Sequence, residues 1–132
     1  MFDAFDRHRP LALSGLRIIS GLMFLQHGTQ KIFGFPAPAM GPFDITSQIG
    51  IGGVLELIGG VLLVLGLFTR PVAFLMSGMM AVAYFQFHAA SGGFFPLVNK
   101  GELAALYCWV FLYLAFSGPG SISADAVLKR GG

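Results

Sequence analysis

The chain has 132 residues, of which 55% are hydrophobic and only 11% are charged, and its mean hydropathy is +0.77. Such a chain has too little polar surface to cover a water-soluble globule, so the lipid bilayer is expected to be one of its partners. The eight basic residues behind the formal net charge of +2 are spread along the chain, and only Lys129 and Arg130 are adjacent, which excludes the basic patch of nucleic-acid-binding proteins. The single cysteine, Cys108, excludes an internal disulfide and a multi-cysteine metal site.

Four apolar segments follow one another, each close to the roughly 20 residues that a helix needs to cross a bilayer. They predict spans at about residues 11–34, 48–68, 72–90 and 102–116. Helix-breaking prolines and glycines interrupt the pattern at 35–42, at a predicted tight turn over 69–71, at 91–101 and at 118–120. The sequence therefore predicts an all-α integral membrane protein, a four-helix bundle forming one domain over residues 1–132.

The distribution of lysine and arginine predicts the orientation of the bundle, because cytoplasmic loops carry an excess of both. With four spans, both termini and the 69–71 turn lie on one side of the membrane, and the loops at 35–47 and 91–101 lie on the other. The first side holds Arg7, Arg9, Arg70, Lys129 and Arg130, and the second holds Lys31 and Lys100. Both termini are therefore expected in the cytoplasm, and the other two loops outside.

Glycines recur in the predicted spans, where small residues let helix backbones approach closely in lipid. In the second span Gly52 and Gly59 are seven residues apart, as are Gly53 and Gly60, so these positions share one side of the helix. We interpret this side as a buried packing face.

Polar and ionisable residues inside the spans predict a site, because a charge near hydrocarbon is costly and normally faces a partner or a water-filled cavity. His27 and Lys31 are four residues apart and share a helix face, and Glu56 is expected to pair with one of them. The predicted outer cluster consists of His27, Lys31, Glu56, His88, Asn99 and Glu102.

A smaller set lies toward the predicted cytoplasmic side, formed by Arg17, Arg70 and Asp125. Because an arginine fork pairs readily with a carboxylate, we expect Asp125 to fold back onto Arg70 or Arg17. The predicted role of this pairing is a structural lock on the inner face of the bundle.

Several motifs together resemble one family. They are G-L-R-I-x-x-G-x-x-F-x-x-H-G-x-x-K at 15–31, E-L-I-G-G-V-L-L-V-L-G-L-F-T-R-P at 56–71, N-K-G-E-L-A-A-L-Y at 99–107 and G-P-G-x-x-S-x-D at 118–125. In order and spacing the chain resembles the DoxX family of small bacterial membrane proteins. The resemblance implies a multi-pass four-helix bundle in the bacterial inner membrane. Some relatives look like subunits of thiosulfate:quinone oxidoreductase, which implies quinone as a ligand and assigns no catalytic residue to this chain.

Three functions remain open. The first is an accessory or binding subunit of a quinone-linked redox system, whose outer cluster holds a quinone or docks a membrane or periplasmic redox partner protein. The second is a redox protein with haem or metal bound by His27 and His88, although the Glu-x-x-His repeats of di-iron bundles are absent. The third is transport of a proton or small solute, for which a homo-oligomer would have to supply the cavity.

Overall fold

The computed structural model describes residues 1–131, and every regular element in that range is a helix. The chain forms two compact units, one of Met1–Thr69 with Pro119–Gly132, called the first unit, and one of Arg70–Gly118, called the second unit. The N- and C-terminal parts of the sequence thus fold together, while the central part forms its own helical unit.

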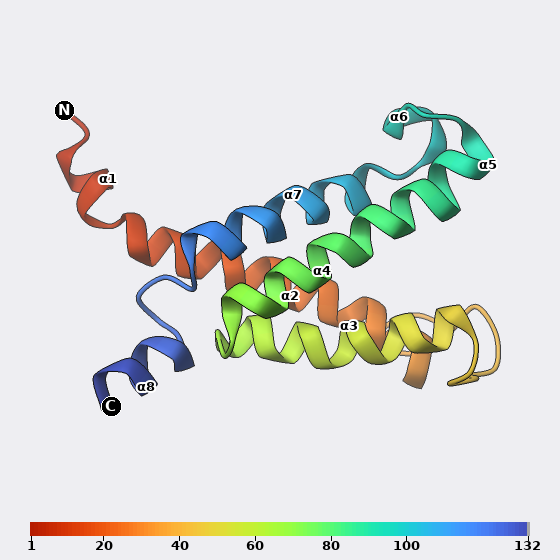
Figure 1. Ribbon diagram of the computed structural model, residues 1–132, viewed down its shortest axis with the longest axis horizontal. Coiled ribbons are helices and arrows are strands. Elements are labelled where there is room, and N and C mark those ends of the chain that lie inside the picture. The colour runs from red at the N-terminus through yellow and green to blue at the C-terminus, as the bar shows by residue number, and fades with distance from the viewer. Residues whose placement is uncertain (132) are drawn as a thin grey trace. The chain divides into compact units, whose positions relative to one another are not determined.

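The first unit is built on two long helices, α2 (Arg9–Phe33) and α3 (Gln48–Leu65), which lie side by side in Figure 1. They run antiparallel, since Leu25 meets Gly60 while Gly28 meets Leu57. Two short helices flank them, α1 (Asp3–Arg7) at the start of the chain and α8 (Ala124–Gly131) at its end. Phe24 and Leu63 are fully buried in this unit.

Glycines set the close approach of α2 and α3. A Cβ atom added at Gly28 would stand 2.6 Å from the Leu57 amide nitrogen, and one at Gly60 would stand 2.7 Å from Leu25 Cα. Both distances are shorter than real Cβ contacts, so backbone packs directly on backbone at these positions. The packing interpretation of Gly53 and Gly60 agrees with this geometry, because a Cβ at Gly53 would stand 3.0 Å from Lys31 Cβ. For Gly52 the interpretation is wrong, because a Cβ there would meet nothing within 4 Å.

The second unit contains a helical segment of 24 residues, Thr69–Gly92, and an antiparallel neighbour, α7 (Glu102–Ser117). The segment consists of α4 (Thr69–Ala83), whose first residue belongs to the first unit, a π-helix η1 (Tyr84–Ala89) and α5 (Ala90–Gly92). The Ser77 hydroxyl donates to the Cys108 carbonyl at 2.7 Å, which links α4 to α7 (Figure 1). A short helix, α6 (Pro96–Asn99), lies in the connection between them.

The four predicted spans correspond to the four long helical segments, and their ends are within three residues of the prediction. The predicted position of the tight turn, at 69–71, is wrong, because the helix ends three residues earlier. α3 ends earlier, at Gly66, whose φ of 70° is left-handed, and the Leu67 amide donates back to the Leu62 carbonyl at 2.9 Å. This is a glycine-terminated helix end. Pro71 lies instead in the first turn of α4, where its missing N–H costs nothing.

Within residues 1–131, two helical segments are long and apolar enough to cross a membrane, Gln48–Leu65 and Thr69–Gly92, and α7 is a shorter apolar helix. On α3 the side chains of Ile51, Leu55, Ile58, Val61 and Leu65 are each 41–54% exposed. Their spacing of three and four residues forms a continuous apolar stripe on one side of the helix. Such a stripe is costly in water and suited to lipid.

Candidate functional site

A buried ion pair joins α2 to α3 in the first unit. The Lys31 Nζ donates to both carboxylate oxygens of Glu56, at 2.7 and 2.8 Å, and the side chains of Lys31 and Glu56 are only 19% and 5% exposed. Gly53 lies one turn before Glu56, and its missing side chain leaves room for Lys31 to cross α3. The structure thus pairs Glu56 with Lys31, which is one of the two partners that the sequence suggests.

His27 lies one helical turn before Lys31 and is half-buried. The charges of both Glu56 and Lys31 act electrostatically on its ring. His27, Lys31 and Glu56 therefore form a three-residue polar group between the two helices.

The loop between α2 and α3 is anchored to both helices. The Thr29 hydroxyl donates to the Phe35 carbonyl at 2.7 Å, and the Gln30 side chain donates to the Pro38 carbonyl at 3.1 Å. At the other end, the Ser47 hydroxyl accepts the Gly50 amide at 2.9 Å and caps α3. These bonds fix the loop onto the ends of α2 and α3, beside Lys31.

Asp44 organises the last part of that loop. Its carboxylate accepts both the hydroxyl and the amide of Thr46, at 2.6 and 2.9 Å, and these hydrogen bonds lower the pKa of Asp44. A Cβ atom at Gly50 would stand 1.9 Å from the Asp44 carbonyl oxygen, so only glycine allows the loop to close onto α3 here.

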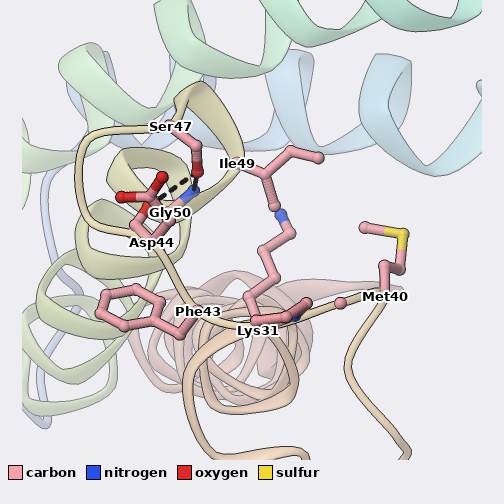
Figure 2. Close-up of a pocket in the computed structure, with 9 residues that line it drawn as sticks. Lys31, Met40, Phe43, Asp44, Ser47, Ile49 and Gly50 are labelled. Carbon is pink, nitrogen blue, oxygen red and sulfur yellow. Dashed lines mark hydrogen bonds between the residues drawn. The ribbon is translucent and has the colours of Figure 1, made fainter.

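A partly open pocket of about 150 Å³ lies between this loop and the two helices, lined by Lys31, Met40, Gly41, Pro42, Phe43, Asp44, Ser47, Ile49 and Gly50. Figure 2 shows Lys31 extending from α2 toward the start of α3, with Met40 and Phe43 on either side of it. The pocket therefore combines apolar walls with the Lys31 ammonium group, which is already held by Glu56, and with the polar residues Asp44 and Ser47. This combination suits a small apolar molecule with a hydrogen-bond acceptor.

The other predicted members of the cluster belong to the second unit. The Asn99 side chain donates to the Gly93 carbonyl at 2.7 Å and accepts the Gly101 amide at 2.7 Å. The His88 Nδ1 lies 3.3 Å from the Asn99 carbonyl oxygen, and Glu102 is exposed at the start of α7. The predicted six-residue cluster is thus divided between the two units, with His88 and Asn99 brought together in one and Lys31 and Glu56 in the other.

The second set of predicted residues binds backbone groups instead of forming ion pairs. Arg17 is 1% exposed and donates to the carbonyls of Leu63 and Ile122 at 2.8 and 2.7 Å, and to that of Pro119. Leu63 lies in the last turn of α3, at the negative end of the helix dipole, which attracts a cation.

Arg70 and Asp125 also bind backbone groups at helix ends, each at a different helix. Arg70 donates to the carbonyls of Ala115 and Phe116 in the last turn of α7, at 3.2 and 2.5 Å. Asp125 accepts the amides of Phe68 and Thr69 at the start of α4, at 2.8 and 2.9 Å. Arg17, one of the two predicted partners, interacts electrostatically with the Asp125 carboxylate, but the hydrogen bonds of Asp125 are to backbone amides. Among the described residues Asp125 caps a helix N-terminus, where unsatisfied amides attract an anion.

Within the described part of the chain, no three side chains of the His, Cys, Asp and Glu types are grouped to hold a metal ion. His27 belongs to the first unit and His88 to the second, so haem or metal bound by this pair stays a prediction.

Sequence reasoning missed the pocket walls, chiefly Met40, Phe43 and Ile49, and the contacts of Tyr84. One signal could have pointed to the pocket: Ser47 directly before an apolar run is typical of a helix N-cap. The apolar loop residues carry no such signal, because only the folded loop brings them over Lys31.

The comparisons with known proteins agree on one family. The DoxX family model matches residues 12–89. An uncharacterized protein of Haemophilus influenzae is 45% identical over 124 residues, covering 91% of this chain and 92% of its own. The inner membrane protein YphA of Escherichia coli is 31% identical over 135 residues, covering 94% of both chains.

CatD of Bacillus subtilis, which is named as a candidate oxidoreductase, is 28% identical over 123 residues, covering 88% of this chain and 86% of its own. No solved structure matches the chain. The relatives named as inner membrane proteins support a location in the bacterial inner membrane. The model match over residues 12–89 and the similarity to YphA along nearly the whole chain show that this protein belongs to the DoxX family.

Proposed function

We propose that this protein is a non-catalytic accessory or binding subunit of a quinone-linked redox system and that the pocket beside Lys31 holds the quinone head group. The observation that carries the proposal is the placement of a buried, Glu56-paired ammonium group in the wall of a small pocket that also has the apolar side chains of Met40, Phe43 and Ile49. The name of CatD supports a link to oxidoreductases.

The size of the pocket suits one ring. A cavity of about 150 Å³ in another protein binds benzene, and the pocket here has a volume of about 150 Å³. A quinone head group is a six-membered ring with carbonyl oxygens, and the third hydrogen on Lys31 Nζ is available to such an acceptor because Glu56 takes two. The apolar tail would leave through the open side into lipid.

In this proposal the four long helical segments all cross the inner membrane, with both termini in the cytoplasm. The Arg and Lys distribution supports this orientation, which puts the pocket near the outer surface. A redox partner in the membrane or periplasm could then exchange quinone with the pocket.

The test uses two variants on the same helix. Ile49 lines the pocket and Ile51 does not, yet the two side chains are almost equally exposed, at 47% and 48%. We expect Ile49→Trp to fill the pocket and weaken binding of a short-chain benzoquinone by at least about tenfold, or about 1.4 kcal/mol. Ile51→Trp should bind as the unaltered protein does. Binding is measured by equilibrium dialysis of the detergent-purified protein.

Equal binding by the two variants would show that quinone does not occupy this pocket. Absence of binding to the unaltered protein, for a naphthoquinone as well as for a benzoquinone, would contradict the proposed function itself. Neither variant replaces Lys31 or Glu56, and circular dichroism of each variant distinguishes a loss of folding from a loss of binding.

A further inference from the structure

The connection between the two helices of the second unit exposes an unusual number of large apolar side chains. Phe94, Phe95, Leu97 and Val98 are 66%, 71%, 80% and 69% exposed. They come from one run, residues 93–101, which we call the aromatic loop, and its only charged residue is Lys100. A loop in water would be expected to carry polar residues at such positions.

The aromatic loop is held in one conformation by a buried side chain. Asn99 is 8% exposed, and its side-chain nitrogen donates to the Gly93 carbonyl and to the Tyr84 hydroxyl, at 2.7 and 3.1 Å. Its side-chain oxygen accepts the Gly101 amide at 2.7 Å. The two ends of the loop are thus tied together through one amide group.

Other bonds satisfy the backbone within the loop. The Tyr84 hydroxyl donates to the Phe94 carbonyl, and the amides of Val98 and Asn99 donate to the Phe95 carbonyl at 3.0 Å each. The Gly101 amide also reaches the Pro96 carbonyl, at 3.2 Å. Irregular backbone is tolerated at membrane depth only when its polar groups find partners inside the protein. The aromatic loop meets this requirement over most of its length, although its side chains point outward.

The lengths of the two helices place the loop at a particular depth. α7 has 16 residues, which span about 24 Å at 1.5 Å per residue, against a hydrocarbon thickness of about 30 Å. The segment Thr69–Gly92 has 24 residues and spans about 36 Å. The two are level at one end, where Arg70 bonds to Phe116. At the other end the longer segment continues beyond the start of α7, so in a bilayer the loop would take up the depth that α7 leaves.

We propose that the aromatic loop is a membrane-inserted cap, whose apolar side chains contact lipid acyl chains and complete the span that α7 leaves short. The inference goes beyond quinone binding and rests on α7 crossing the membrane. Lipid is the occupant that fits, because Phe94, Phe95, Leu97 and Val98 are exposed without a charged residue among them, and Phe85 and Phe87 of the helix before the loop are exposed as well. Lys100 can extend its long side chain to the lipid headgroups.

The experiment uses the fact that Trp109 is the only tryptophan in the chain. In a W109F background, L97W places a single reporter at the most exposed apolar position of the loop. The full-length protein is reconstituted alone into phosphatidylcholine vesicles, with and without bromine on the acyl chains. The unaltered protein, with Trp109 70% exposed on α7, is the lipid-facing reference, and K129W in the W109F background is the reference for a charged, exposed position.

We expect brominated lipid to quench the fluorescence of L97W by at least half as much as it quenches that of the unaltered protein. We expect iodide in the buffer to quench the fluorescence of L97W less than it quenches that of K129W. Quenching by iodide without quenching by brominated lipid would overturn the proposal and indicate a loop that projects into water, as a partner-binding loop would. Quenching by neither would overturn it as well, since the loop would then be covered by protein. If L97W does not fold, F94W gives the same readout from the same loop.

Discussion

The Lys31 ammonium and the Glu56 carboxylate meet across α2 and α3 with two hydrogen bonds, of 2.7 and 2.8 Å, although both side chains are mostly buried. Removing one partner of such a pair leaves an uncompensated charge in a low-dielectric surrounding. The ion pair as a whole therefore adds little to the free energy of unfolding, but replacing either residue alone is expected to lower it strongly.

We predict that Lys31→Met lowers the free energy of unfolding by about 3–5 kcal/mol, because Glu56 stays buried without its cation. The double variant Lys31→Met with Glu56→Met should recover most of that loss, since no charge remains to be desolvated. Unfolding of the detergent-solubilised protein by sodium dodecyl sulfate, followed by circular dichroism, measures both. Lys100→Met, at an exposed position, is the control and should be nearly neutral. A double variant no more stable than the single one would argue against the pairing.

The crossing of α2 and α3 gives a second prediction, on two glycines of the same helix. A Cβ at Gly60 would stand 2.7 Å from Leu25 Cα, whereas one at Gly52 would meet nothing within 4 Å. We expect Gly60→Ala to destabilise the protein by about 1–3 kcal/mol, because the helices must move apart. Gly52→Ala should be neutral or stabilising by up to about 1 kcal/mol, because alanine favours a helix over glycine. The same unfolding assay compares them, and equal effects would show that close packing at Gly60 does not limit stability.

The sequence was sufficient to predict the long helices, because their signals are local. Apolar runs of about 20 residues and the breakers at Pro36 and Gly118 fall within a few positions of the helix ends. The turn before α4 was misplaced because Pro71 was interpreted as a breaker, whereas proline also fits the first turn of a helix.

The partners of the charged residues were not predictable in the same way. Arg17 bonds to Leu63 and to Ile122, 46 and 105 residues away, and both acceptors are backbone carbonyls. Every residue offers a carbonyl, so composition cannot mark which ones a buried arginine will reach. For Lys31 and Glu56 the prediction was easier, because an intramembrane charge needs an opposite charge and the helices offered few.

Asp125 gives a prediction on pH, outside the membrane-spanning segments. Partial burial alone would raise the pKa of Asp125, but hydrogen bonds from Thr69 and Phe68 and the charge of Arg17 outweigh it and hold the pKa below its usual value. A carboxylate with a lowered folded-state pKa stabilises the fold above its unfolded-state pKa, about 3.9. That stabilisation is lost as the pH falls through the folded-state value.

Asp125→Asn should therefore cost about 1 kcal/mol at pH 7, the typical value of a helix cap, and progressively less below about pH 4. Chemical unfolding of the variant and of the unaltered protein gives the difference in their free energies of unfolding at pH 7 and at pH 3. Asp3→Asn, at an exposed position of α1, is the matched control and should change stability little at either pH. A cost of Asp125→Asn that is the same at both pH values would mean that the negative charge does not act at the start of α4.

Arg17→Lys tests whether the planar fork or the positive charge holds the C-terminal segment. The guanidinium binds carbonyls of α3 and of the 119–122 segment at once, through three different nitrogens, whereas an ammonium presents one donor centre and cannot reach both. Each hydrogen bond to a charged group is worth about 1.5–3 kcal/mol. We expect Arg17→Lys to lose at least one such bond and to release the segment locally, with faster amide hydrogen exchange at Ser121 and Asp125. Arg9→Lys, on the exposed start of α2, should leave exchange there unchanged. Unchanged exchange in Arg17→Lys would mean that charge alone holds the segment, through attraction to the last carbonyls of α3.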